Sequence, residues 1–371
     1  MSRRIFVSAG EPSGDAHAAA LVRALRAADP DLTVEGVGGA QMAAAGAELI
    51  ARIEDLTVIG FVEVLTKVPA HWRLLNAVRR RLASGEIGLI ILVDYPGFHL
   101  RVATAAKALG VPVLYYIAPQ LWAWHESRVR RMARDVARLA VILPFEETFF
   151  RERGVNASFV GHPLLDRPPV PGTGAERKVA LGLDPGRPVL GLFPGSRGQE
   201  TARLWPAFRE AARLVVTRRP EVQCIVAASA AGRYPDPGAI RVIEGRPAEC
   251  FAVADAALSK SGTTTLEAAI ADTPQVIAYR MNALSYHLAR RLVTVPWIGL
   301  VNLVAGRQVA PELVQGAVTP QALAAAVLPL LDPGSPERVA QLEGCAEVRR
   351  RLGGPGAAMR AAAIARDLLA A

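Results

Sequence analysis

The sequence predicts an α/β protein with two doubly wound domains that face each other across a cleft. Short, uninterrupted apolar runs, which are typical of strands buried on both faces, alternate with helical segments along the chain. Residues 161–178, rich in proline and glycine, interrupt this alternation, which starts again after them. A length of 371 residues also favours two domains over one. We therefore expect two domains of similar architecture joined by that linker.

The first half of the chain supplies the elements of the first domain. Apolar runs predict strands at residues 4–10, 32–39, 87–97, 112–119 and 138–145. Helical patterns occupy residues 15–30, 71–84, 101–111, 127–136 and 146–155. Strands that alternate with helices in this way indicate a parallel sheet with helices on both faces.

The second half repeats the pattern without repeating the sequence. Strands are expected within residues 187–193, 222–229, 240–245, 255–262 and 273–279. Helices are expected at 201–218, near 247–254, at 263–272 and, after a Gly/Pro break, at the end of 348–371. In such domains ligands bind at the carboxyl ends of the strands, so the loops at those ends are the first places to look for a site.

Composition limits which binding partners and which cellular compartment we expect. The net charge of +9 favours an anionic partner, whether nucleic acid, membrane lipid or a phosphorylated substrate. Cys224, Cys250 and Cys345 have the spacing of neither a metal site nor a disulfide framework, which favours a reducing cytosol. No run of about 18 apolar residues occurs, so we expect no membrane-spanning helix, and the N-terminal run is too short for a signal peptide.

The loop after the first strand is the first candidate ligand site. Gly10 and Gly14 permit tight turns and a close ligand, and Glu11, Ser13 and Asp15 lie between or beside them. Alternatively, Ser13 or Asp15 simply caps the helix that follows. The loop lacks the G-x-G-x-x-G pattern, and Gln41 breaks it in the later "GVGGAQM", which disfavours a nicotinamide enzyme.

The segment "LFPGSRGQE", residues 192–200, is the second candidate. A strand ends at Phe193, and Arg197 stands between Gly195 and Gly198 before the next helix. Backbone N–H groups at a helix start bind phosphate, and an arginine adds paired donors. The alternative is an arginine merely exposed on a glycine turn. No Gly-Lys-Ser/Thr follows, which disfavours ATP hydrolysis.

The segment "LSKSGTTTLEAAIA", residues 258–271, is the third. Four of the five residues 261–265 carry hydroxyl groups, whereas a helix cap needs one. Glu267 lies six residues after Ser261, too far for a capping box, and its carboxylate suits a ribose diol. An anion at this helix start would explain the extra hydroxyls, although ordinary capping with exposed threonines stays possible.

Asp94 stands directly after the apolar run "IGLIILV", at the end of a buried strand where packing does not call for an acid. A partly desolvated carboxylate has a raised pKa and can accept a proton from a sugar hydroxyl. A turn or capping role is the alternative. His125 and His162 are weaker candidates, each more often structural. The apolar segment 56–75, with Lys67, His71 and Arg73 near its end, suits either an interfacial helix on anionic lipid or a core helix.

The ordered motifs resemble one family. "SAGEPSGD", "GVGG", "VIGFVEVL", "VDYPGFHLR", "PQLWAWHESRV", "PFEETFF", "VGHPLLD", "LFPGSRGQE", "SKSGTTTLEAA", "YRMNALSY" and "NLVAGR" follow one another from residue 6 to about 315. Together they are similar to the lipid-A-disaccharide synthases. The resemblance implies a GT-B glycosyltransferase of lipid A and lipopolysaccharide biosynthesis, with two Rossmann-like domains and a C-terminal helix that returns to the first domain. The expected divisions are 1–165 for the acceptor, 166–345 for the UDP-sugar and 346–371 for the returning helix.

The resemblance also implies the reaction. An inverting transfer would join UDP-2,3-diacylglucosamine to 2,3-diacylglucosamine 1-phosphate (lipid X), giving the β-1,6 disaccharide 1-phosphate and UDP without a cofactor or metal. The enzyme would be peripheral on the cytoplasmic face of the inner membrane of a Gram-negative bacterium, in contact with anionic lipid and with no nucleic-acid partner, and it could form a homodimer.

Residue by residue, Asp94 and Arg197 match the family's essential acid and arginine, and Asn302 matches an Asn at the nucleotide end of the cleft. With the loops above, this gives an expected nucleotide site made of Gly195, Ser196, Arg197, Ser261, Gly262, Thr263, Thr264, Thr265, Glu267 and Asn302. The expected acceptor or sugar site contains Gly10, Glu11, Ser13, Gly14, Asp15, His125 and His162. Acyl chains would pass from the membrane along Val58, Ile59, Phe61, Val62 and Leu65.

The chain departs from the family's usual D-x-P-D-F-N pattern at Gly97 and His99, and from its usual Pro at Val301. Asp94 is therefore the only acid of its loop. Two rival hypotheses remain. Another GT-B enzyme of nucleotide sugars, such as a UDP-GlcNAc 2-epimerase, would crowd acids and histidines into the cleft. A non-enzymatic basic module would have no use for Asp94 at the end of a buried strand.

Overall fold

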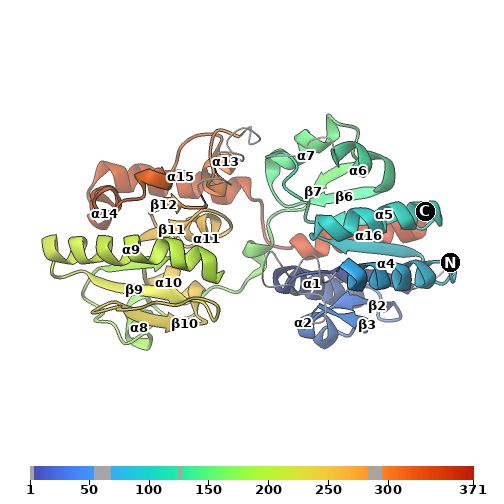
Figure 1. Ribbon diagram of the computed structural model, residues 1–371, viewed down its shortest axis with the longest axis horizontal. Coiled ribbons are helices and arrows are strands. Elements are labelled where there is room, and N and C mark those ends of the chain that lie inside the picture. Colours follow the sequence, from blue (N-terminus) through green and yellow to red (C-terminus); the bar gives the residue numbers. More distant parts are fainter. Residues whose placement is uncertain (1–3, 54–67, 124–127, 283–285, 287–294) are drawn as a thin grey trace. The chain divides into compact units, whose positions relative to one another are not determined.

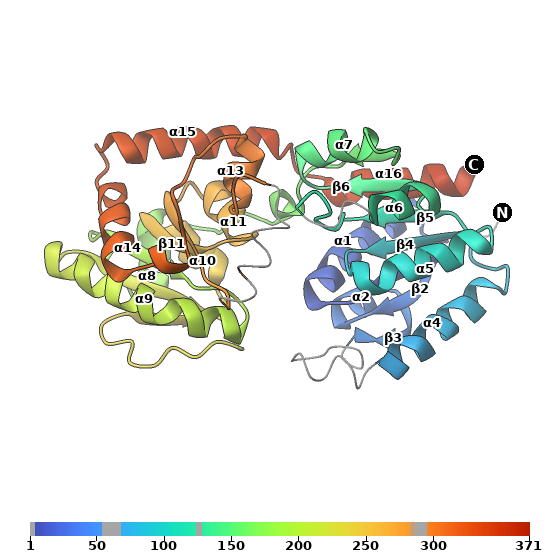
Figure 2. The same ribbon diagram turned by 45° about the horizontal axis from the view of Figure 1, so that its top comes forward.

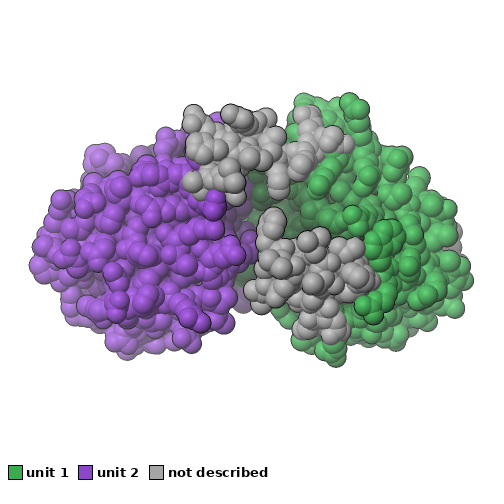
Figure 3. Space-filling view, in the orientation of Figure 1, with its two compact units in different colours: residues 1–167, 352–371 green, residues 168–351 purple. Residues whose placement is uncertain are grey.

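The computed structural model describes residues 4–53, 68–123, 128–282, 286 and 295–371. The chain divides into two compact units, coloured separately in Figure 3: Met1–Arg167 with Leu352–Ala371, and Pro168–Arg351. The sequence placed the second boundary at 345/346. That position falls inside a single helix, α15 (Pro336–Arg351), so the segment that returns to unit 1 begins at Leu352 instead.

Unit 1 is built on a parallel sheet of the order β3-β2-β1-β4-β5-β6-β7 in its described residues (Figure 1). The strands are β1 (Arg4–Ala9), β2 (Thr33–Gly38), β3 (Glu48–Arg52), β4 (Leu89–Val93), β5 (Val113–Tyr116), β6 (Arg138–Val141) and β7 (Ala157–Phe159). Every residue of the central strand β4 is buried, as its uninterrupted apolar sequence predicts.

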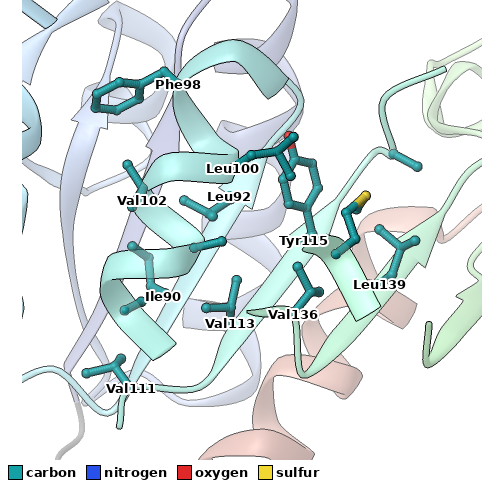
Figure 4. Close-up of a cluster of buried hydrophobic side chains, with 14 of the residues drawn as sticks. Ile90, Leu92, Phe98, Leu100, Val102, Val111, Val113, Tyr115, Val136 and Leu139 are labelled. Carbon is teal, nitrogen blue, oxygen red and sulfur yellow. The ribbon is translucent and has the colours of Figure 1, made fainter. Parts of the chain in front are cut away.

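Helices cover both faces of this sheet (Figure 2). They are α1 (Pro12–Ala28), α2 (Ala40–Ala44), α4 (Val68–Leu82), α5 (Pro96–Ala108), α6 (Val129–Asp135), α7 (Pro144–Arg151) and α16 (Ala357–Ala370). On one face, residues of α4, α5 and α6 share one hydrophobic cluster with Ile90 and Leu92 of β4, and Figure 4 shows a part of this cluster. On the other, α1 and α16 pack on Leu89, Ile91 and Val93. The alternation of β4 side chains thus serves two separate cores.

The start of α16 is tied to the end of the first chain segment of unit 1. The Asp166 carboxylate, in the 3₁₀ turn Pro163–Asp166, accepts hydrogen bonds from the backbone N–H groups of Gly356, Ala357 and Ala358 at 2.5, 3.2 and 3.3 Å. A carboxylate at a helix N-terminus satisfies unpaired donors and complements the helix dipole. The Leu352 carbonyl also accepts from the His162 N–H at 3.1 Å.

Unit 2 has its own parallel sheet, of the order β10-β9-β8-β11-β12-β13 in the described residues. The strands are β8 (Val189–Phe193), β9 (Gln223–Ala228), β10 (Arg241–Glu244), β11 (Ala256–Lys260), β12 (Gln275–Tyr279) and β13 (Glu312–Val314). The helices besides α15 are α8 (Gly174–Ala180), α9 (Gly198–Arg218), α10 (Pro247–Val253), α11 (Thr264–Ile270), α13 (Leu300–Ala305) and α14 (Pro320–Val327), with 3₁₀ turns at Gln315–Ala317 and Pro329–Leu331.

The predicted alternation is confirmed in both units, and the differences are local. The expected linker 161–178 is partly ordered, since it contains the 3₁₀ turn Pro163–Asp166 and the start of α8. The sequence missed β3 because its residues are all exposed or only half-buried, so it shows no apolar run. Among the described residues, no helix combines the length and the hydropathy that crossing a bilayer requires.

Candidate active site

Two sequence-predicted loops of unit 1 lie side by side. Strands β1 and β4 are neighbours, with Ala9 opposite Val93, so the loops that follow them emerge at the same edge of the sheet. Asp94 and Tyr95 follow β4 with φ angles of +51° and +52°. Among the described residues, these are the only two consecutive non-glycine residues with positive φ. Each costs on the order of 1 kcal/mol or more, and such strain is typical of functional loops.

The Tyr95 ring lies on Gly10 and joins the two loops. A Cβ atom on Gly10 would stand 2.2 Å from ring carbons of Tyr95, so only glycine fits beneath this ring. The Tyr95 hydroxyl lies 2.9 Å from His71 Nε2 on α4. Burial raises the pKa of Tyr95, and the Glu11 carboxylate raises it further, which places Glu11 close to the same ring. Gly10, Glu11, Asp94 and Tyr95 therefore form one edge of unit 1.

The remaining predicted residues of unit 1 divide into exposed and internal ones. Ser13 is exposed on the first turn of α1, and Gly14 is buried beneath it. Asp15 is buried, and its carboxylate accepts from the N–H groups of Gly39, Gln41 and Met42 at 2.7, 3.0 and 3.2 Å. Asp15 thus caps α2, and does not cap its own helix as the sequence alternative held.

His162 is internal as well. Its Nδ1 accepts from the Leu164 N–H at 3.2 Å, and burial, assisted by the charges of His17 and Arg167, lowers its pKa to about 3. His162 is therefore neutral at physiological pH. His125 and the predicted membrane-facing residues Val58, Ile59, Phe61, Val62 and Leu65 lie outside the described residues.

The sequence missed one buried acid near this edge. Glu146, at the start of α7, accepts from Trp122 Nε1 at 3.0 Å and from the N–H groups of Ile142 and Leu143 at 3.3 and 3.0 Å. Burial raises its pKa to about 7, and the Asp94 charge contributes in the same direction. The fragment "PFEE" reads as an ordinary helix start, so only the tertiary structure reveals that this acid is buried and near Asp94.

In unit 2 the two predicted nucleotide loops are also neighbours. Strands β8 and β11 pair, with Phe193 opposite Ser259, so residues 194–198 and 261–264 leave the sheet at one edge. Gly195 has φ of +117°, and a Cβ there would stand 2.5 Å from the Glu200 carboxylate. Ser196 is exposed, and the exposed Arg197, with 72% of its side chain accessible, is the N-cap residue of α9.

A third charged side chain completes this edge and was missed by the sequence interpretation. Lys260, the last residue of β11, has its Nζ 2.9 Å from Glu200 Oε1, and Arg197 Nη1 lies 3.8 Å from the same oxygen. Two cations therefore flank one carboxylate where β11 ends and α9 begins. The signal was available, because Lys260 directly precedes Ser261, but a lysine that ends a strand has no distinctive motif.

The hydroxyl groups of the third segment have different surroundings. Ser261 Oγ donates to the Ile298 carbonyl at 2.6 Å, and Thr265 Oγ1 donates to the Gly262 carbonyl at 2.8 Å. Thr263 is exposed, Thr264 is half-buried, and no side chain caps α11. The capping alternative is therefore wrong for this helix. Gly262, with φ of +129°, forms the turn, and Glu267 is half-buried.

Asn302 is fully buried in unit 2. Its amide donates to the Ala310 carbonyl and to Glu312 Oε1, each at 2.8 Å, and accepts from the N–H groups of Val309 and Ala310 at 2.7 and 2.9 Å. Glu312 also accepts from the N–H groups of Ile298 and Gly299. Asn302 thus fixes the backbone at residues 309–310 and, through Glu312, the start of α13.

The two edges differ in chemistry. The edge of unit 1 carries carboxylates and aromatic rings, and that of unit 2 carries cations and a helix start with unused hydroxyls. Within the residues described, no three His, Cys, Asp or Glu side chains gather as metal ligands would. A carboxylate can accept a proton, and the cationic edge can hold a phosphate.

Comparisons with known proteins agree with one another. A model of the lipid-A-disaccharide synthetase family matches residues 5–364. The lipid-A-disaccharide synthase of Myxococcus xanthus (strain DK1622) is 44% identical over 374 residues, covering 99% of this chain and 97% of that protein. The protein of the same name from Anaeromyxobacter dehalogenans (strain 2CP-C) is 42% identical and covers 98% of this chain and 96% of its own.

Solved structures of lower identity share the fold. The glycotransferase of kitacinnamycin has a TM-score of 0.65 at 18% identity and covers 98% of both chains. MurG of Acinetobacter baumannii has 0.57 at 14%, covering 98% of this chain and 99% of its own. The UDP-GlcNAc 2-epimerase of Neisseria meningitidis has 0.58 at 10%, covering 99% and 98%. The fold is GT-B, as predicted, and it does not by itself separate transferases from epimerases.

Proposed function

Since the chain belongs to the lipid-A-disaccharide synthase family, and is therefore an enzyme that makes this disaccharide by glycosyl transfer, we propose its substrates and mechanism. The donor is UDP-2,3-diacylglucosamine and the acceptor is 2,3-diacylglucosamine 1-phosphate. The transfer inverts the anomeric carbon and releases the β-1,6 disaccharide 1-phosphate and UDP. Membership of this family argues against the epimerase hypothesis, although the fold is compatible with both.

The observation that carries the proposal is the cationic edge of unit 2. Arg197 and Lys260 flank one carboxylate, Glu200, at the start of the 21-residue helix α9. A departing diphosphate gains negative charge in the transition state, so fixed cations and a helix N-terminus stabilise it more than they stabilise the bound donor. In this proposal they do so without a metal, Ser196 and residues 262–264 meet the phosphates, and Glu267 binds the ribose.

On the edge of unit 1, Asp94 acts as the general base. Its carboxylate takes the proton of the acceptor's 6-hydroxyl as that oxygen attacks the anomeric carbon, and the bond from this carbon to the UDP oxygen breaks on the opposite face. The alternative is that Asp94 only orients the acceptor. Gly10, Glu11, Ser13 and Gly14 contribute the acceptor pocket beside it.

Five predicted residues take indirect roles in this proposal because their polar atoms are committed inside their own units. Asp15 holds the loop before α2, and His162 holds the turn that precedes the second unit. Ser261, Thr265 and Asn302 support the backbone around α11 and α13. We further propose that the enzyme is peripheral on the inner membrane, on anionic lipid, with acyl chains entering along residues 58–65.

Mass spectrometry of the products from the two acylated glucosamine substrates tests the proposal. Asp94→Ala and Arg197→Ala should each lower kcat/KM by roughly a hundredfold or more, the scale of lost acid–base or leaving-group stabilisation. Arg213→Ala is the matched control, because Arg213 is an exposed arginine on the same helix, with 68% of its side chain accessible. A product of epimerisation would refute the proposed reaction, and wild-type rates in both variants would refute the proposed roles of Asp94 and Arg197.

A further inference from the structure

The backbone of Asp94 is held by two side chains from other parts of unit 1. The Asp94 carbonyl oxygen accepts from Tyr115 Oη and from His99 Nδ1, each at 2.6 Å. Tyr115 lies on the neighbouring strand β5 and His99 on the first turns of α5, and neither ring is accessible to solvent. A carbonyl oxygen has two lone pairs, so these two donors occupy it fully.

The Asp94 carbonyl also fixes the tautomer of His99, and Ser8 is a third partner that fits it. A carbonyl can only accept, so Nδ1 carries the hydrogen and Nε2 is left as an acceptor. The hydroxyl of the buried Ser8 on β1 lies 2.9 Å from Nε2 and therefore donates to it. Burial lowers the pKa of His99 to about 4, so the ring stays neutral and keeps this tautomer at physiological pH.

Tyr115 and His99, which together we call the clamp, act on a strained turn. Asp94 and Tyr95 both have left-handed backbone angles, φ +51° and +52°. Residues other than glycine adopt such angles only when their surroundings hold them. The carbonyl that the clamp holds belongs to the peptide unit between these two residues. Rotation of that unit changes ψ of Asp94 and φ of Tyr95, and so changes where the Asp94 carboxylate and the Tyr95 ring lie.

We propose that His99 is a positioning residue for Asp94: with Tyr115, it holds the Asp94–Tyr95 peptide unit so that the carboxylate meets the acceptor hydroxyl. The inference rests on the proposed role of Asp94 as the base. It assigns the effect of His99 to one atom, the Nδ1 donor, and leaves substrate contact to Asp94. Displacing a reacting group by about 1 Å can cost on the order of a hundredfold in rate, so loss of the clamp should appear in kcat.

Two substitutions of His99 by amides distinguish the roles of its two ring nitrogens. The side-chain nitrogen of Asn occupies nearly the position of Nδ1, and that of Gln the position of Nε2. His99→Asn should therefore keep the bond to the Asp94 carbonyl and retain kcat within about threefold, whereas His99→Gln should lower kcat about tenfold or more with KM little changed. Tyr115→Phe removes only the second donor and leaves the packing intact. It serves as the test if His99→Gln does not fold, and it should also lower kcat selectively.

Measuring the effect of His99→Gln in the Asp94→Asn variant distinguishes a positioning role from general support of the fold. If His99 acts through Asp94, adding His99→Gln to Asp94→Asn should produce little further loss, because interacting residues are not additive. Additive losses, or equal wild-type rates in His99→Gln and Tyr115→Phe, would overturn the inference. Wild-type activity in Asp94→Asn alone would instead overturn the proposed function. A crystal structure of His99→Gln supplies a readout besides activity: the Asp94–Tyr95 peptide unit should rotate, so that φ of Tyr95 differs from +52°.

Discussion

Acidification should loosen unit 1 well before it denatures the chain as a whole. Burial lowers the pKa of three histidines in this unit, that of His17 to about 4, that of His99 to about 4 and that of His162 to about 3. A group whose pKa is lower in the folded state than its usual 6.5 gives full stability above 6.5. That stability is lost as the pH falls, because the unfolded chain takes up the proton and the folded chain does not.

The size of the effect follows from these values. Between pH 7.5 and pH 5, each of the three histidines removes about 2 kcal/mol, since the unfolded imidazole is almost fully protonated at pH 5 and the folded one is not. Glu146 acts in the opposite direction. Its folded pKa is about 7, so it binds a proton more tightly than in the unfolded chain and regains about 2 kcal/mol over the same interval. A net loss of about 4 kcal/mol remains.

Hydrogen exchange measured by mass spectrometry, corrected for the intrinsic effect of pH, can follow both units in one sample. Peptides from β1, β4 and α1 should lose protection between pH 7.5 and 5, and peptides from β8, β9 and α9 serve as the internal control. His162→Gln should reduce the loss by about 2 kcal/mol, because glutamine does not titrate. Protection in unit 1 that changes by less than about 1 kcal/mol would refute the claim that these histidines are neutral and coupled to folding.

Four further predictions concern the site, the returning helix and the membrane. Lys260→Gln should weaken UDP binding about tenfold in calorimetry, because the diphosphate loses one cation and the Glu200 carboxylate beside it loses its partner. Unchanged affinity would show that Lys260 is not part of the site. Gly10→Ala should displace Tyr95 and lower kcat about tenfold or more, whereas Gly97→Ala, where an added Cβ meets nothing within 4 Å, should not. Asp166→Ala should cost about 1 kcal/mol or more and expose α16 to proteolysis, with the surface variant Asp367→Ala as the control; equal proteolysis would argue against the cap. Replacing Val58, Phe61 and Leu65 with Ser should release the protein from anionic liposomes without unfolding it, and retained binding would return this segment to the core.

The sequence could predict where the site loops lie because parallel strands bring their carboxyl ends together. The structure adds the strand order, which places the loop of Asp94 beside the loop of Gly10, and the loop of Arg197 beside Ser261, each through one pair of neighbouring strands. Hydrogen-bond partners could not be predicted in the same way. Asp15 meets Gly39 across 24 positions, and Tyr115 meets Asp94 across 21, so their pairing depends on how separate segments pack.

The charged residues of the site could likewise be predicted only in part from the sequence. Lys260 and Glu146 belong to no motif, and their importance depends on neighbours that the tertiary structure brings near, Glu200 in one case and Trp122 in the other. Asn302 carries a family motif, but its amide is spent on internal hydrogen bonds. The motifs thus lead to one edge of the sheet in each unit, while the division between residues at the edge and residues behind it depends on the tertiary structure.

The cap that Asp166 places on α16 has a consequence for how the chain is made. Unit 2 is continuous, residues 168–351, whereas unit 1 is completed only by residues 352–371. Until those residues leave the ribosome, the face of the first sheet that Ala361 and Ala365 cover stays open, although every other strand and helix of unit 1 has long been synthesised. Translation therefore favours an order of folding in which the second unit folds before the first is complete. Chaperones would act on that open face.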